Sequence, residues 1–216
     1  FLGQNDVISA HGSVITYLVY IQSFSLGVSV STTTYVGNFA GEGSVSKVKR
    51  YATVGAILEG IVCVLIFVVT FGWRGEIADL YTEKEDINRL IRIILILYCL
   101  GMFADYGSNF LAFILRTLNQ QRIVTICFAI SYYLVGAPLS YFFGFSLGLG
   151  IWGIWAGILL GYWTMLSLMV WRTRLLRLTD EVMLIQKLMR EKEAKGIVEG
   201  QTFKELETDD DSFTTL

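Results

Sequence analysis

The chain alternates between long apolar runs and short polar links, and the runs have the length of membrane-spanning helices. Five runs stand out, at residues 7–36, 51–73, 90–115, 123–143 and 151–171. A helix that rises ~1.5 Å per residue needs about 20 residues to cross the hydrocarbon core of a bilayer, and every run reaches that length. The pattern therefore predicts an all-α membrane protein, a polytopic bundle of about five transmembrane helices embedded in the lipid bilayer.

The first run is more polar than the other four. Serines, threonines and Gln22 are interleaved with Ile, Leu and Val along residues 7–36. Hydroxyl side chains can bond back to carbonyls of their own helix, and polar groups are tolerated at membrane depth where they line a cavity. We therefore expect this helix to line a cavity rather than to face lipid throughout. A glycine-rich segment at residues 37–43 is predicted to form the turn that follows it.

Two acids interrupt the apolar runs. Asp105 lies about midway along the third run, and Glu59 lies well inside the second. A carboxylate in the membrane costs ~2.5–3.5 kcal/mol on insertion scales, so an intramembrane acid is expected to face a polar interior and to mark a functional site. Asp105 is the first candidate for binding a coupling cation, and Glu59 is a possible second acid. The alternative for each is a structural acid that is hydrogen-bonded or paired between helices.

Three further residues are candidates for functional roles, two of them near Asp105 and one in the fourth run. Tyr98 lies seven positions before Asp105 and Asn109 lies four positions after it, which places all three on one face of a helix. Tyr98 and Asn109 are therefore candidate polar neighbours of the acid, with hydrogen bonds of helix packing as the alternative. Pro138 lies inside the fourth run, where proline removes a backbone hydrogen bond and is predicted to kink the helix. It is a candidate hinge, because broken helices often bend in transport cycles.

Composition agrees with a membrane protein and gives no sign of an enzyme. Of the 216 residues, 54% are hydrophobic and 17% are charged, whereas soluble domains carry ~25% charged residues. The three cysteines, Cys63, Cys99 and Cys127, lie in apolar runs without the spacing of a metal site. We recognise no nucleophile elbow and no nucleotide loop in the sequence. We predict neither a metal nor another cofactor, and no nucleic acid among the partners.

Basic residues favour one orientation in the membrane. The links on one side of the five spans carry eight of them, and the links on the other side carry four. Since cytoplasmic loops carry an excess of Lys and Arg, the C-terminus is predicted to be cytoplasmic. The eight residues are Lys47, Lys49, Arg50, Arg116, Arg122, Arg172, Arg174 and Arg177.

Two segments follow the last span. Residues 172–195 are predicted to form a basic, amphipathic juxtamembrane helix. Its apolar stripe would rest on anionic lipid and consists of Val182, Ile185, Leu188 and Met189. Residues 196–216 are polar and acidic and are predicted to be disordered.

Several local patterns together resemble the sequence motifs of one protein family. Val-Gly-Asn-Phe-Ala-Gly-Glu-Gly at residues 36–43 is similar to the turn after that family's eighth helix. Tyr-Tyr-Leu-Val-Gly-Ala-Pro-Leu at residues 132–139 is similar to its eleventh helix, and residues 147–155 resemble the entry to its twelfth. Ile-Leu-Arg at residues 114–116 resembles the link after its tenth helix. The order and spacing of these patterns agree over residues 6–171, and together they resemble those of the multidrug and toxic compound extrusion (MATE) transporters.

The resemblance implies a cation-coupled antiporter with two six-helix lobes, which exports organic cations and other xenobiotics in exchange for H⁺ or Na⁺. This chain would be a MATE-like C-terminal lobe, a fragment that lacks its partner, the N-terminal lobe, and the seventh helix. A first residue of Phe1 rather than Met agrees with a piece of a longer chain. The family's acid on the tenth helix corresponds to Asp105, eleven positions before Arg116. The membrane would be the plasma membrane, or a vacuolar or other organelle membrane.

Two other functions remain open at this point. A lipid or oligosaccharide flippase of related architecture would require a basic rather than an acidic central cavity. A non-transporting membrane scaffold would bind its partners through the acidic tail at residues 196–216. Neutralising Asp105 should affect only the antiporter, and deleting the tail should affect only the scaffold.

Overall fold

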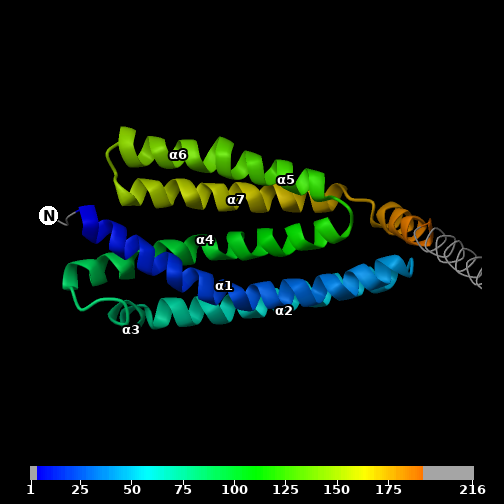
Figure 1. Cartoon of the computed structure of the whole chain (residues 1–216), viewed down its shortest axis with the longest axis horizontal. Coiled ribbons are helices and arrows are strands. Elements are labelled where there is room, and N and C mark those ends of the chain that lie inside the picture. Colours follow the sequence, from blue (N-terminus) through cyan, green and yellow to red (C-terminus); the bar gives the residue numbers. More distant parts are fainter. Residues whose placement is uncertain (1–3, 192–216) are drawn as a thin grey trace, which may run out of the picture.

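The computed structural model describes residues 4–191, which fold into long helices joined by short links (Figure 1). Five helical segments in this range are long and apolar enough to cross a membrane, which confirms the predicted polytopic helical bundle. The fourth of these segments combines α-helical and π-helical stretches. In chain order the elements are α1 (Gln4–Gly41), α2 (Val45–Gly72), α3 (Arg74–Asp79), α4 (Glu85–Thr117), α5 (Gln121–Ala129), η1 (Ile130–Gly136), α6 (Ala137–Tyr141), η2 (Phe142–Ser146) and α7 (Ile151–Leu175).

Helix α4 lies at the centre of the bundle. It contacts α1, α2 and α3 on one side and α5 and α7 on the other (Figure 1). In the most apolar window of α4, 61% of the residues are buried, against at most 33% in the other four spans. The helix that carries Asp105 is therefore the one whose surroundings are mostly protein.

The turn between α1 and α2 is shorter than the sequence predicts. Helix α1 continues through Gly41, so the prediction of a turn over residues 37–43 was wrong. Val36 and Ala40 are buried in a cluster with residues of α2 and α4. Packing of this kind outweighs the ~1 kcal/mol that a glycine costs inside a helix. The chain reverses instead at Gly43, whose φ of 78° lies in the left-handed region that favours glycine.

The last described helix packs on the end of the bundle. Helix α7 continues through Leu175, and a separate helix covers residues 178–191, so the juxtamembrane helix predicted from residue 172 begins later than expected. Val182 and Ile185 are buried in the same cluster as Val36 and Ala40. The expectation that they rest on lipid was wrong, because they cover the ends of α1, α2 and α4. The predicted disordered tail at residues 196–216 lies outside the described residues.

The links gather at two opposite ends of the bundle. The α1–α2 turn, the α4–α5 link and the end of α7 lie at one end, and the α2–α4 connection and the link before α7 lie at the other (Figure 1). This is the alternation on which the orientation argument depends. The cytoplasmic location of the C-terminus itself stays a prediction.

The fourth span is not a uniform α-helix. The π-helical stretches η1 and η2 flank α6, and Pro138 lies in the first turn of α6. Single wide turns of this kind are common where a helix departs from regular bonding, as it must around a proline. Ser140 lies on α6, and its Oγ donates a 3.0 Å hydrogen bond to the carbonyl of Ile154 on α7. The two spans therefore form a close hairpin, and the role of Pro138 as a hinge stays a prediction.

A small polar cluster closes the α3–α4 link, and we expect it to depend on pH. Asp79 Oδ1 accepts hydrogen bonds from Asn88 Nδ2 at 2.5 Å and from Arg92 Nη2 at 2.9 Å. Both hydrogen bonds lower the pKa of Asp79 from its ordinary value of 3.8, and the bond from Asn88 has the larger effect. A lowered pKa means that the stabilisation is present above pH 3.8 and is lost as the pH falls through the folded-state pKa.

Once the pH dependence of the intrinsic exchange rate is divided out, the amides of the α3–α4 link should therefore be less protected from hydrogen exchange at acidic pH, and Asp79→Asn should remove that loss of protection. Glu83→Gln, which changes an exposed acid in the same link, is the matched control. The same pH profile in the wild-type chain and in Asp79→Asn would contradict the assignment.

Candidate functional site

Asp105 is buried at the middle of α4 and is held by its own helix. Only 6% of the residue is exposed. Asn109 Nδ2 donates a 2.8 Å hydrogen bond to Asp105 Oδ1, and a 2.9 Å bond to the Asp105 carbonyl oxygen. Ser108 Oγ donates to the same carbonyl at 2.9 Å. The side chain of Asn109, one turn along the helix, therefore fixes one carboxylate oxygen, as the predicted shared face allows.

Groups from three other elements surround this carboxyl. It interacts electrostatically with Cys63 on α2, with Tyr132 on η1 and with Tyr162 on α7. Within the described part of the chain, no ion pair joins Asp105 or Glu59 to a basic side chain. A buried carboxylate without a cationic partner is unfavourable, so both acids are groups that a proton or another cation would neutralise.

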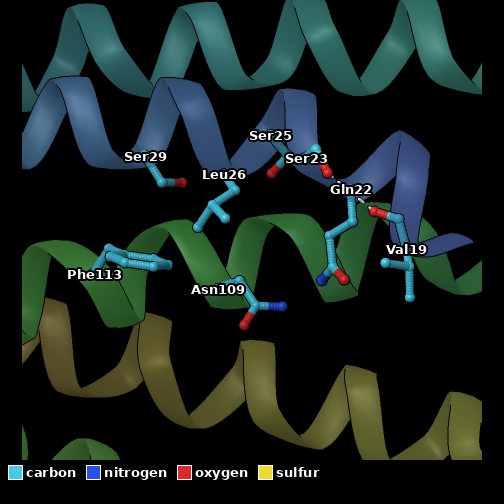
Figure 2. Close-up of a pocket in the computed structure, with 8 residues that line it drawn as sticks. All are labelled: Val19, Gln22, Ser23, Ser25, Leu26, Ser29, Asn109 and Phe113. Atoms are coloured by element: carbon cyan, nitrogen blue, oxygen red, sulfur yellow. Dashed lines mark hydrogen bonds between the residues drawn. The ribbon is translucent and has the colours of Figure 1, made fainter.

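A cavity of about 320 Å³ lies between α1 and α4 (Figure 2). In Figure 2 the side chain of Gln22 comes from α1 and that of Asn109 from α4, the two helices that line the cavity. Its wall combines hydroxyls and amides with a few apolar side chains, and carries no basic residue. The lining consists of Val19, Gln22, Ser23, Ser25, Leu26, Ser29, Asn109 and Phe113.

Each acid is one hydrogen bond away from this cavity. Asn109 lines the cavity and binds Asp105. Ser25 also lines the cavity, and its Oγ donates a hydrogen bond to Glu59 Oε1. The tertiary structure thus connects two acids on different helices, through Asn109 and Ser25, to residues that line one cavity.

The predicted site residues fall into three groups. Asn109 lines the cavity, and Asp105 and Glu59 are each hydrogen-bonded to a residue that lines it. Tyr98 is 1% exposed in an apolar cluster with Tyr106 and does not line it. Pro138 lies in α6, which packs against α7 rather than against α4. No finding tests the functional roles of these residues, so those roles stay predictions.

Sequence reasoning noted Gln22 and the hydroxyl residues of α1 and expected the helix to line a cavity, but it did not propose any of them as site residues. Gln22, Ser25 and Ser29 carry the polar surface that faces α4. Their spacing of three and four residues is the available signal, because such positions share one helix face. Most other hydroxyls of α1 bond back to their own helix, as Ser23 Oγ does to the Val19 carbonyl at 3.1 Å.

The fold and the site together define an integral membrane protein of the polytopic helical class, with two buried acids close to a cavity between its helices. The chain belongs to the MatE family, whose model matches residues 2–142. MATE proteins form a family of transporters, not of enzymes. The predicted resemblance to this family is therefore confirmed.

Known relatives support the same assignment over part of their length. Multidrug and toxin extrusion protein 1 of Mus musculus is 27% identical over 148 residues, which is 68% of this chain and 26% of that protein. The probable multidrug resistance protein NorM of Listeria innocua is 28% identical over 156 residues, 72% of this chain and 34% of that protein. This chain thus spans about a quarter to a third of the curated relatives it matches.

A solved structure has the same fold. The crystal structure of the eukaryotic MATE transporter AtDTX14 superposes with a TM-score of 0.76 at 18% identity. The match covers 83% of this chain and 41% of that chain. At this identity the likeness concerns the fold, and it agrees with one lobe of a larger transporter.

Proposed function

We propose that this chain is the C-terminal lobe of a secondary antiporter that exports organic cations and other xenobiotics in exchange for H⁺ or Na⁺. The observation that carries the proposal is Asp105, a buried acid with no basic partner among the described residues. It lies at the centre of the bundle and is bonded to a residue that lines a polar cavity. Family membership and the names of the relatives agree with export.

Coupling would follow from competition for the carboxylate. Burial favours the neutral acid, and a bound cation favours the ionised form, so a coupling cation and a cationic substrate oppose each other at one site. Asn109 would keep the carboxyl oriented toward the cavity whichever cation is bound, because its amide donates to the same oxygen. Loading of the coupling cation from outside would then release the substrate, and release of that cation inside would reset the site.

The cavity has the chemistry expected for an organic cation. Phe113 supplies an aromatic wall, Val19 and Leu26 supply apolar contact, and Gln22 supplies an amide. An ammonium group is attracted to aromatic faces, and its substituents are accommodated by apolar side chains. The flippase alternative is not favoured, because its phosphate-bearing substrates require basic side chains, and the lining has none.

Transport would require a second lobe. Central sites in such transporters form between repeats, so we propose that an N-terminal lobe packs against this one to enclose the cavity. The excess of basic residues at one end of the bundle supports a cytoplasmic C-terminus. The plasma membrane and a vacuolar or other organelle membrane are the proposed locations.

The test uses the two-lobe protein reconstituted into liposomes. A labelled organic cation should accumulate against its own gradient when an opposing H⁺ or Na⁺ gradient is imposed, and collapsing that gradient with an ionophore should stop it. Imposing each gradient separately identifies the coupling ion. Protein-free liposomes are the control, and transport that ignores both gradients would rule out the antiporter.

A further inference from the structure

Glu59 is the buried ionisable group that the proposed function leaves without a role. It lies midway along α2 and is 4% exposed. Ser25 Oγ on α1 donates to Glu59 Oε1, whereas Glu59 Oε2 is buried and has no hydrogen-bond partner among the described residues. Carboxylate oxygens that are buried in proteins are normally hydrogen-bonded or bound to a cation, so one oxygen of this group remains available for a ligand.

A second unpartnered oxygen lies on the facing helix. Ser29 is fully buried, lines the cavity, and its Oγ has no hydrogen-bond partner among the described residues. It lies one helical turn from Ser25, on the same face of α1. Neighbouring hydroxyls of α1 bond to their own helix, as Thr32 Oγ1 does to the Val28 carbonyl at 2.8 Å. Ser25 Oγ instead donates to Glu59, and Ser29 Oγ makes no hydrogen bond to any described residue, although both side chains are buried.

The two acids of this lobe both interact with one thiol. The Cys63 thiol, on the same helix as Glu59, interacts with both Glu59 and Asp105. Tyr106 on α4 interacts with Asp105, with Cys63 and with Tyr17 on α1. The other titratable groups that interact with Asp105 are Tyr98 on α4, Tyr132 on η1 and Tyr162 on α7. Basic side chains are absent from this set and from the cavity wall. Two carboxylates in one membrane interior cannot both remain ionised without cations.

We propose that Glu59, Ser25 and Ser29 form a second monovalent-cation site, for H⁺ or Na⁺, on the α1–α2 side of the cavity. The inference deepens the proposed function, because it gives this lobe two exchangeable cations, at Asp105 and at Glu59. The oxygen ligands are the available carboxylate oxygen of Glu59 and the two hydroxyls. Such hard oxygen donors suit H⁺ and Na⁺ rather than soft metals.

The alternative is that Glu59 only joins α1 to α2. A neutral hydrogen-bonding residue would perform that task without placing a charge in the membrane, and would leave no carboxylate oxygen unsatisfied. The two roles differ in one measurable respect. A joining residue affects stability alone, whereas a site residue affects cation binding at unchanged stability.

The experiment measures cation binding to the full 216-residue chain in phospholipid nanodiscs. Infrared difference spectra between alkaline and acidic pH detect protonated carboxyls through their C=O stretch, and labelled Na⁺ detects sodium binding. The wild-type chain should show the signals of two acids. Glu59→Gln, which keeps the size and an acceptor for Ser25, should lose one acid signal or weaken Na⁺ binding about tenfold.

A second variant separates a loss of cation binding from a loss of stability. Ser29→Ala removes a buried hydroxyl that has no partner among the described residues, so it should leave the melting temperature unchanged or raised. It should nevertheless weaken Na⁺ binding, or shift the C=O frequency of protonated Glu59. Ser167→Ala is the matched control, because Ser167 is an exposed mid-span serine on α7 whose Oγ bonds to the Trp163 carbonyl at 2.7 Å.

The outcomes separate this inference from the proposed function. Loss of the proton signal in Glu59→Gln supports a proton site, and loss of Na⁺ binding supports a sodium site. If both measurements match the wild type in Glu59→Gln and in Ser29→Ala, the second site does not exist. The Asp105→Asn chain should retain the Glu59 signal, so a failure of Asp105-dependent export would leave this result standing.

Discussion

Asp105→Asn is expected to reduce cation-coupled export to the background of protein-free liposomes while the protein stays folded in the membrane. The substitution removes the charge and the exchangeable proton but keeps the size of the side chain. Its amide oxygen can still accept the 2.8 Å hydrogen bond from Asn109 Nδ2, so the packing of α4 is preserved. Removing a buried charge without a basic partner also removes its desolvation cost, and stability should not fall.

Uptake of a labelled organic cation by the reconstituted two-lobe protein measures the effect, and thermal unfolding of the same sample measures the fold. Glu83→Gln is the matched control, since it neutralises an exposed acid in the α3–α4 link. Asp105→Glu should restore part of the export, because the carboxylate returns with a longer side chain. Undiminished export by Asp105→Asn would remove the coupling role.

Gly157→Leu is expected to prevent or severely weaken folding of the α6–α7 hairpin. A Cβ atom at Gly157 would collide with the backbone nitrogen of Ser140, and Gly153 faces the backbone of Phe143 in the same way. Backbone atoms cannot move aside without separating the two spans, so the cost should be about 3 kcal/mol or more. The glycines at every fourth position of α7, Gly153, Gly157 and Gly161, thus set the distance between the helices.

The measurement is the yield of monodisperse protein in detergent and its unfolding temperature. Gly60→Leu is the matched control, because Gly60 is an exposed mid-span glycine of α2, and a Cβ atom added there would meet no other atom within 4 Å. That change should be neutral or slightly favourable for the helix. Equal yields of both variants would mean that the two spans are not in close contact in the membrane.

Several features of the protein could be predicted because they depend on residues that are near one another in the chain. The five spans follow from run length against bilayer thickness, and a single acid amid apolar residues identifies Asp105. The pairing of Asp105 with Asn109 follows from helical periodicity, since the two are four residues apart. The family resemblance likewise rests on short motifs.

Other features depend on which helix faces meet. Glycines at residues 37–43 predicted a turn, but burial of Val36 and Ala40 keeps α1 helical through Gly41. The amphipathic stripe of residues 178–191 predicted a contact with lipid, but Val182 and Ile185 pack against other helices of the protein. An apolar stripe reports only that a face is buried, and lipid and protein both satisfy it.

Taken alone, the amino-acid order determined that this is a helical membrane protein with two mid-span acids that are unfavourable in lipid. Each span must be long and apolar enough to cross the bilayer by itself, so this information is local. The packing of the helices decided that α4 is central, that Glu59 accepts a hydrogen bond from Ser25, and that each acid is hydrogen-bonded to a residue that lines one cavity. The contact between Ser25 and Glu59, for example, joins residues 34 positions apart. Their partners are selected by the fit of side chains across helices, and no local pattern contains that information.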